Sequence, residues 1–205
     1  MEDSKNDQDS LIMMKLILSL TLIWTLSSTA EALQCWQSEG DSRWELRPCD
    51  STDLCASVAA QGYVNQNLQQ ITNRLCLPSS LFSEGKHTYS YNVGFETMTV
   101  SVHVCNTDGC NSEDIPFPDV QKKNNLKCFT SDDPSSAECN QTVQCEGVQD
   151  RCFSGTAEDI RGTFHTFGCV SANLCEILSH LELPFPYVEF LRAPTCCGSS
   201  FCNSA

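Results

Sequence analysis

The chain has 205 residues, 15 of them cysteine, and a formal net charge of −14 at neutral pH. So many cysteines are typical of oxidising compartments, where disulfides support domains too small to build a sufficient core. A net acidic chain without a basic cluster is a poor partner for nucleic acid or for anionic lipid headgroups. The length leaves room for one or two domains, and these numbers favour an extracellular protein.

The N-terminal segment has the features of a secretory signal peptide. Lys15 precedes an apolar run from Leu16 to Leu26, and Ala30-Glu31-Ala32 follows as a small-residue cleavage pattern. The apolar run is short for a bilayer span, which argues against the alternative of a signal anchor. We therefore expect residues 1–32 to be removed, with Met13 or Met14 as an alternative start, and the mature chain to be secreted.

The cysteines fall into two groups that share landmarks. Leu33-Gln34-Cys35-Trp36 matches Leu126-Lys127-Cys128-Phe129, and the closing Cys105-x4-Cys110-Asn111 matches Cys197-x4-Cys202-Asn203 at nearly the same offset. Such a match indicates an internal duplication. It divides the mature chain into a first unit, residues 33–111, and a second unit, residues 126–205. A polar, proline-containing linker, residues 112–125, joins the two units.

Sequence patterns predict β-strands in both units. Apolar and polar residues alternate from Met98 to Val104 and from Tyr89 to Phe95, and a similar run from Phe164 leads into Cys169. The segment from Gln61 to Arg74 is compatible with a helix, but its polar, asparagine-rich composition favours a long loop or finger. We therefore predict an all-β, disulfide-rich fold.

The Leu-x-Cys-aromatic start and the Cys-x4-Cys-Asn end of each unit resemble those of the lymphocyte-antigen-6 and urokinase-receptor domain, a relative of the snake three-finger toxins. The resemblance covers nearly all of the mature chain, twice. It implies two tandem domains, each a small disulfide knot from which three β-hairpin fingers project. It also implies seven disulfides, namely Cys35–Cys55, Cys49–Cys76, Cys105–Cys110, Cys128–Cys152, Cys145–Cys169, Cys175–Cys196 and Cys197–Cys202.

This pairing leaves Cys139 without a partner, because Ser131 stands where the family has the second cysteine. An odd cysteine in a secreted protein is either an intermolecular partner, which would give a disulfide-linked dimer, or a free thiol. The following residues, Asn140-Gln141-Thr142, form an acceptor sequence for N-glycosylation. A glycan on Asn140 would sit on the first finger of the second unit and could shield Cys139.

The sequence contains no recognisable catalytic or metal-binding constellation. His-Glu-x-x-His, a nucleophile elbow, a glycine-rich phosphate loop and paired Cys-x2-Cys units are all missing. We therefore expect a protein that is not an enzyme and that needs no metal or other cofactor. The histidines are scattered along the sequence at His87, His103, His165 and His180.

Three-finger domains act by surface recognition, in which a rigid knot limits the entropy that the fingers lose on binding. Two such domains resemble the gamma-type phospholipase A2 inhibitors, which implies a secreted inhibitor or scavenger of an extracellular protein such as a secreted phospholipase A2. The acidic charge would suit a basic phospholipase. A toxin-like modulator of ion channels is a further alternative, although such proteins usually have one domain.

The main alternative is a urokinase-receptor-like cell-surface receptor or adhesion protein. A longer form of it would carry a glycolipid anchor, because Asn203-Ser204-Ala205 is similar to the beginning of an anchor-attachment site. The two hypotheses share an extracellular protein partner and differ in what that partner is.

Aromatic side chains on the fingers are the expected contacts with a partner. The apolar stretch from Leu181 to Phe190 is the preferred contact finger. For every aromatic residue the alternative is a place in the thin core of a small sheet. The chosen contacts are Phe185, Tyr187, Phe190, Tyr89 and Tyr91, and further candidates are Trp44, Tyr63, Phe82, Phe95 and Leu191.

Overall fold

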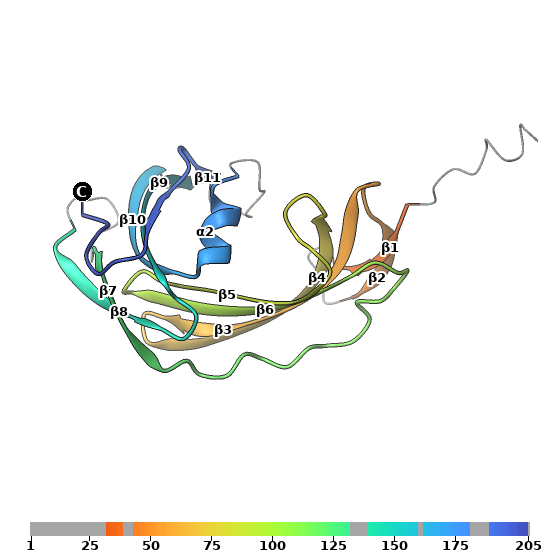
Figure 1. Cartoon of the computed structure of the whole chain (residues 1–205). Coiled ribbons are helices and arrows are strands. Elements are labelled where there is room, and N and C mark those ends of the chain that lie inside the picture. The colour runs from red at the N-terminus through yellow and green to blue at the C-terminus, as the bar shows by residue number, and fades with distance from the viewer. Residues whose placement is uncertain (1–31, 39–42, 132–138, 160–161, 181–188, 205) are drawn as a thin grey trace, which may run out of the picture.

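The computed structural model describes residues 32–38, 43–131, 139–159, 162–180 and 189–204. Within these ranges the chain consists of β-strands and one short helix (Figure 1). The first unit contains β1 (Gln34–Gln37), β2 (Glu45–Pro48), β3 (Asp53–Val64), β4 (Asn67–Pro78), β5 (Gly85–Asn92) and β6 (Glu96–Cys105). The second contains β7 (Lys123–Thr130), β8 (Gln141–Glu146), β9 (Arg151–Asp159), β10 (Gly162–Val170), α2 (Ala172–Leu178), β11 (Glu189–Phe190) and β12 (Thr195–Cys197).

These elements confirm the predicted fold class, which is all-β and rich in disulfides. The predicted signal peptide lies outside the described residues, except for Ala32. Most of the preferred contact finger, residues 181–188, lies outside them as well.

A long finger formed by β3 and β4 occupies the region from Gln61 to Arg74. The two strands pair without a break from Asp53–Pro78 to Val64–Asn67. Asn65 and Gln66 join them with φ values of 49° and 67°. Both values lie in the left-handed region that a two-residue type I′ turn requires, and asparagine tolerates that region well. The segment is therefore a finger, as its composition favoured, and not a helix.

Strands of both units join in one antiparallel sheet, in the order β11-β9-β10-β5-β6-β3-β4, with β12 beside β9. The strand pairing that joins the two units, between β10 and β5, is short. Cys169 of β10 lies opposite Asn92 of β5, and Val170 lies opposite Tyr91. Gly168 makes this approach possible, because a Cβ atom there would lie 2.1 Å from the Asn92 carbonyl oxygen.

Seven disulfides cross-link the two units, three in the first unit and four in the second. They join Cys35 to Cys55, Cys49 to Cys76, Cys105 to Cys110, Cys128 to Cys152, Cys145 to Cys169, Cys175 to Cys196 and Cys197 to Cys202. These are the pairs that the family resemblance implies. Most of these cysteines form a buried cluster in each unit, separate from the hydrophobic core, so cross-links supply much of what a larger core would otherwise supply.

The asparagine that follows the last cysteine of each unit clamps the first strand to the central strand. Asn111 is buried, and its side chain accepts the Trp36 N–H at 2.9 Å and donates to the carbonyl oxygens of Trp36 at 2.9 Å and Ala56 at 3.0 Å. One side chain thus satisfies three backbone groups from two strands. In the second unit, Asn203 makes the equivalent contacts with Phe129 and Phe153.

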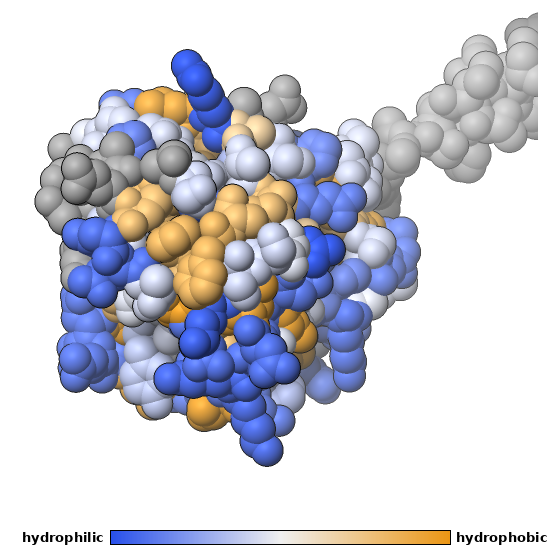
Figure 2. Space-filling model, turned by 60° about the vertical axis from the view of Figure 1, so that its left-hand side comes forward, coloured by the Kyte–Doolittle hydropathy of each residue, from blue (hydrophilic) through white to orange (hydrophobic). Residues whose placement is uncertain are grey.

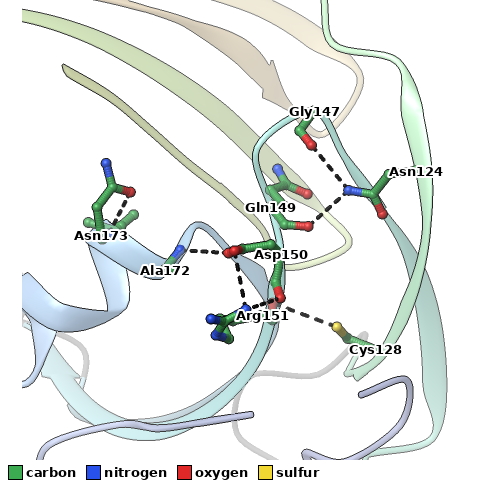
Figure 3. A network of polar contacts seen from close by, with 9 residues as sticks. Asn124, Cys128, Gly147, Gln149, Asp150, Arg151, Ala172 and Asn173 are labelled. Carbon is green, nitrogen blue, oxygen red and sulfur yellow. Dashed lines mark hydrogen bonds and ion pairs between the residues drawn. The ribbon is translucent and has the colours of Figure 1, made fainter. Parts of the chain in front are cut away.

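A polar network fixes the β8–β9 turn against the first unit (Figure 3). The Asn124 side chain donates to the carbonyl oxygens of Gly147 and Gln149 at 3.2 and 2.9 Å. Gln149 is fully buried, and its amide donates to the Ser90 hydroxyl of β5 at 2.8 Å. Asp150 accepts the Ala172 N–H at the start of α2 at 2.8 Å. The turn therefore connects β5, β7 and α2.

Helix α2 completes the core of the first unit from the second unit. Ile177 is buried and packs with Phe82, Tyr89 and Val102 of the first unit. No sequence pattern predicted this helix, and none indicated that it would pack on the other unit. The two units consequently share a hydrophobic core as well as a sheet.

The linker follows the face of β3 that α2 does not cover. The Ser57 hydroxyl donates to the Glu113 carbonyl oxygen at 3.1 Å, and the Gln61 amide donates to that of Pro118 at 3.3 Å. Asp114 forms an ion pair with Arg74 at 2.7 Å. The last residues of the predicted linker, from Lys123, belong to β7.

Replacing Asn111 by alanine should destabilise the fold by about 2–4 kcal/mol, because three hydrogen bonds are lost and buried backbone groups stay unpaired. Urea unfolding with the disulfides intact measures the change. Asn106→Ala is the matched control, since Asn106 is exposed and should change stability by less than about 0.5 kcal/mol. Equal stability of the two variants would contradict the role of the clamp.

Candidate functional site: an aromatic surface at the finger tips

Three aromatic side chains gather where the finger tips of the first unit meet β10 of the second. Tyr63 and Phe95 line one hollow of about 440 Å³. Phe95 and Phe164 line a smaller adjoining one. We call these three residues the tip surface. Phe95 lies between the other two and links the units within it.

Hydrogen bonds between the loops hold the tip surface in place. The Asn65 N–H donates to the Phe95 carbonyl oxygen at 2.9 Å, which joins the β3–β4 turn to the β5–β6 loop. The hydroxyl of Thr130, on β7, donates to the Val93 carbonyl oxygen at 2.8 Å. Gly94 has a φ of 89°, and a Cβ atom there would lie 3.1 Å from that hydroxyl. The loop that carries Phe95 is therefore anchored to both units before any partner arrives, which lowers the ordering cost of binding.

A hydrogen bond between Tyr91 and Glu96 holds the base of this loop. The Tyr91 hydroxyl donates to the Glu96 carboxylate. Burial, with the neighbouring negative charge and hydrogen bond of Glu96, raises the pKa of the Tyr91 phenol well above its ordinary value. Tyr91 therefore stays protonated over the physiological range and acts as a permanent donor.

Two of the three aromatic side chains of the tip surface are exposed, and Phe164 is half-buried. Tyr63 and Phe95 are 43% and 42% exposed, and no charged residue occurs from Leu54 to Asn73 in the finger that carries Tyr63. Figure 2 shows the side of the molecule on which the finger tips lie, where apolar side chains form a band surrounded by hydrophilic ones. Protein-binding surfaces are enriched in aromatic side chains that are exposed on a rigid frame.

The predicted contact residues have different places in the structure. Tyr89 is only 7% exposed, because its ring packs edge-on against Phe82 in the shared core. Tyr91 is half-buried and bonded to Glu96. As a correction to the sequence interpretation, these two tyrosines support the sheet and offer little surface to a partner.

Among the second unit's predicted contacts, Phe185 and Tyr187 lie outside the described residues. Phe190 lies on β11 opposite Ala157, and its ring covers Gly155, where a Cβ atom would be 3.0 Å away. Leu191 beside it is 45% exposed.

Trp44 supports the frame, whereas Phe164 contributes to the tip surface. Trp44 is half-buried, with the Arg74 guanidinium 4.8 Å above its ring, so it belongs to the frame. Phe164 joins the tip surface, although the sequence assigned it only to a strand. Its alternation with Thr166 could have indicated an outward position, but nothing local pointed to the other unit.

Two of the four histidines come together in the structure. His87 and His180 line a cavity of about 230 Å³ between β5 and α2, with Glu176 and Tyr89 also in its wall. The His87 Nε2 atom lies 2.7 Å from the Ser83 carbonyl oxygen. Among the described hydrogen bonds, neither histidine contacts a serine hydroxyl, so the cavity holds no assembled nucleophile and base.

The close groups of cysteine sulfurs do not form a metal site. Cys35, Cys49 and Cys76 have sulfur atoms within 4.8 Å of one another, as do Cys128, Cys145 and Cys169. All six are in disulfides, and a metal ligand must be a free thiolate.

Cys139 and Asn140 lie directly before β8, the second strand of the β7–β8 hairpin. Cys139 carries a free, half-buried thiol. Its sulfur is 3.9 Å from the Asn203 carbonyl oxygen. Asn140 and Thr142 are both exposed. An intermolecular disulfide through Cys139 stays a prediction.

No protein-family model matches the chain. Curated relatives do match it over most of its length. It is 23% identical to the urokinase plasminogen activator surface receptor of the mouse over 202 residues, which cover 92% of this chain and 59% of the receptor. The cattle receptor is also 23% identical, over 89% of this chain and 64% of the receptor. The chain resembles the urokinase receptors.

The rat receptor is 21% identical over 87% of this chain, so the resemblance extends across both units. The chain spans about six-tenths of the length of these receptors. A solved structure, that of mouse TEX101, aligns with a TM-score of 0.31 and 13% identity over 77% of this chain and 87% of that chain. Among the described residues, no helix has the length and apolar character that a membrane crossing needs.

Proposed function

We propose that the chain is a non-catalytic, extracellular binding module that holds a protein partner at the tip surface. The observation that carries the proposal is the exposure of Tyr63 and Phe95 on loops that are already anchored to both units. Large aromatic side chains lose little conformational freedom on binding, and they are enriched among residues that dominate binding energy. The cysteine-rich composition supports a place outside the cell.

The relatives favour a receptor as the more specific function of this binding module. Each of the three is named as a surface receptor for urokinase plasminogen activator. That protease is therefore the first ligand to test. Inhibition of a secreted phospholipase A2 is the second candidate, and it is supported by the excess of acidic over basic residues, which would steer a basic enzyme toward the chain.

The binding experiment compares the intact secreted chain with Tyr63→Ala and Phe95→Ala against urokinase plasminogen activator and a panel of secreted phospholipases A2. Each substitution should weaken binding to the true ligand about tenfold or more, as expected for an anchor worth about 1.4 kcal/mol. Surface plasmon resonance gives the dissociation constants.

Phe117→Ala is the matched control, because Phe117 is an exposed phenylalanine on the linker. It should change the dissociation constant by less than about threefold. Binding that survives both tip substitutions would contradict the tip surface as the binding site. The absence of binding to every ligand of the panel would contradict both the receptor and the phospholipase-inhibitor function.

We also propose that Asn140 carries an N-linked glycan. Its side chain and that of Thr142 are exposed at the start of β8, where a glycosylating enzyme can reach the acceptor sequence. Protein secreted from mammalian cells should migrate faster on a gel after treatment with an amidase that removes N-glycans. Thr142→Ala should abolish this shift and Thr142→Ser should retain it. An unshifted wild-type band would refute the assignment.

A further inference from the structure

The first half of β4 is an open edge of the large sheet. β4 ends the strand order, and among the described strands its long edge pairs only with β3 (Figure 1). Every residue from Asn67 to Asn73 is exposed. Leu68 and Ile71 are 52% and 54% exposed. We call residues 67–73 the β4 edge.

The turn geometry fixes which backbone groups of the β4 edge face outward. In a two-residue hairpin the residues that flank the turn, here Val64 and Asn67, exchange both hydrogen bonds, and the pattern alternates from there. The N–H and C=O groups of residues 67, 69, 71 and 73 therefore point to β3. Those of Leu68, Gln70 and Thr72 point away from the sheet, in the register that a further antiparallel strand would need.

The β4 edge lacks the features that normally prevent pairing. Edge strands are protected by charged residues, proline, bulges or short length. The β3–β4 finger has no charged residue and no proline from Leu54 to Asn73, and its pairing has no bulge. Protection begins only at Arg74, which pairs with Asp114 and lies over Trp44, and at Cys76, which is bonded to Cys49.

We propose that the β4 edge pairs, antiparallel, with the same edge of a second copy of this chain. A two-fold axis at Gln70 sets Leu68 opposite Thr72 of the other copy and Gln70 opposite itself. All of these residues have outward-facing backbone groups, so the register is self-complementary. The same register sets Asn67 opposite Asn73, an amide facing an amide at both ends.

Charge favours this edge as the meeting point of two copies. The chain has 26 acidic residues against 12 basic ones, so its net negative charge repels a second copy. The β4 edge is uncharged, so the copies can approach there with least repulsion. Seven paired residues make a small interface, so the dimer is weak and depends on concentration. The inference does not rest on the proposed function.

The test measures the mass of the full secreted chain by sedimentation equilibrium at concentrations up to about 0.5 mM, the range in which a weak interface becomes occupied. All samples carry Cys139→Ser, so a disulfide-linked dimer cannot contribute. The parent should pass from monomer to dimer as its concentration rises. Gln70→Pro removes one outward donor and leaves the β3 pairing intact, so this variant should stay monomeric.

Two further variants and hydrogen exchange complete the test. Gln70→Thr keeps the N–H and should dimerise like the parent, whereas Gln70→Lys places two positive charges together and should weaken the dimer at low salt and recover at high salt. Amides of Leu68 and Thr72 should gain protection from exchange as concentration rises, while Gln69 and Ile71 stay protected throughout. A chain that stays monomeric, or a dimer that Gln70→Pro leaves unchanged, would overturn the proposal.

Discussion

The fold depends on the knot of disulfides at the base of each unit and on the asparagine that closes it. Cross-links fix where the strands begin, but the first strand of each unit pairs with its neighbour, β2 or β8, along one edge only, and its other edge needs hydrogen-bond partners. Asn111 and Asn203 supply those partners, each through three hydrogen bonds to two strands. Because the strands are fixed at their base, fingers as long as β3 and β4 can extend with only a thin hydrophobic core.

The joining of the two units turns a pair of small domains into one binding frame. The β10–β5 crossing, the buried Gln149 and the packing of Ile177 link the units by sheet, hydrogen bond and core. Thr130 then anchors the loop of Phe95. The aromatic surface therefore consists of parts that neither unit would hold in place alone.

The successful predictions came from local patterns in the sequence. The alternation before Cys105 predicted β6, and the asparagine-rich stretch after Gln61 favoured a finger. The packing of α2, the crossing at Cys169 and the tip surface depend on contacts between residues far apart in the sequence. No local signal marks them, since Phe164 looks like any strand residue. Tyr89 lies in a stretch where apolar and polar residues alternate, and this pattern does not tell an inward from an outward aromatic side chain. Its burial follows from the packing of Ile177 and Phe82 around it.

The central claim is that the two units move as one body, and amide residual dipolar couplings of the isotope-labelled chain test it most directly. Couplings from the first unit and from the second are fitted separately to the structure. One rigid frame predicts alignment tensors of the same magnitude and orientation for both units. Tensors that differ in orientation, or a marked reduction in one of them, would show that the units move independently and would contradict a binding surface built across their junction.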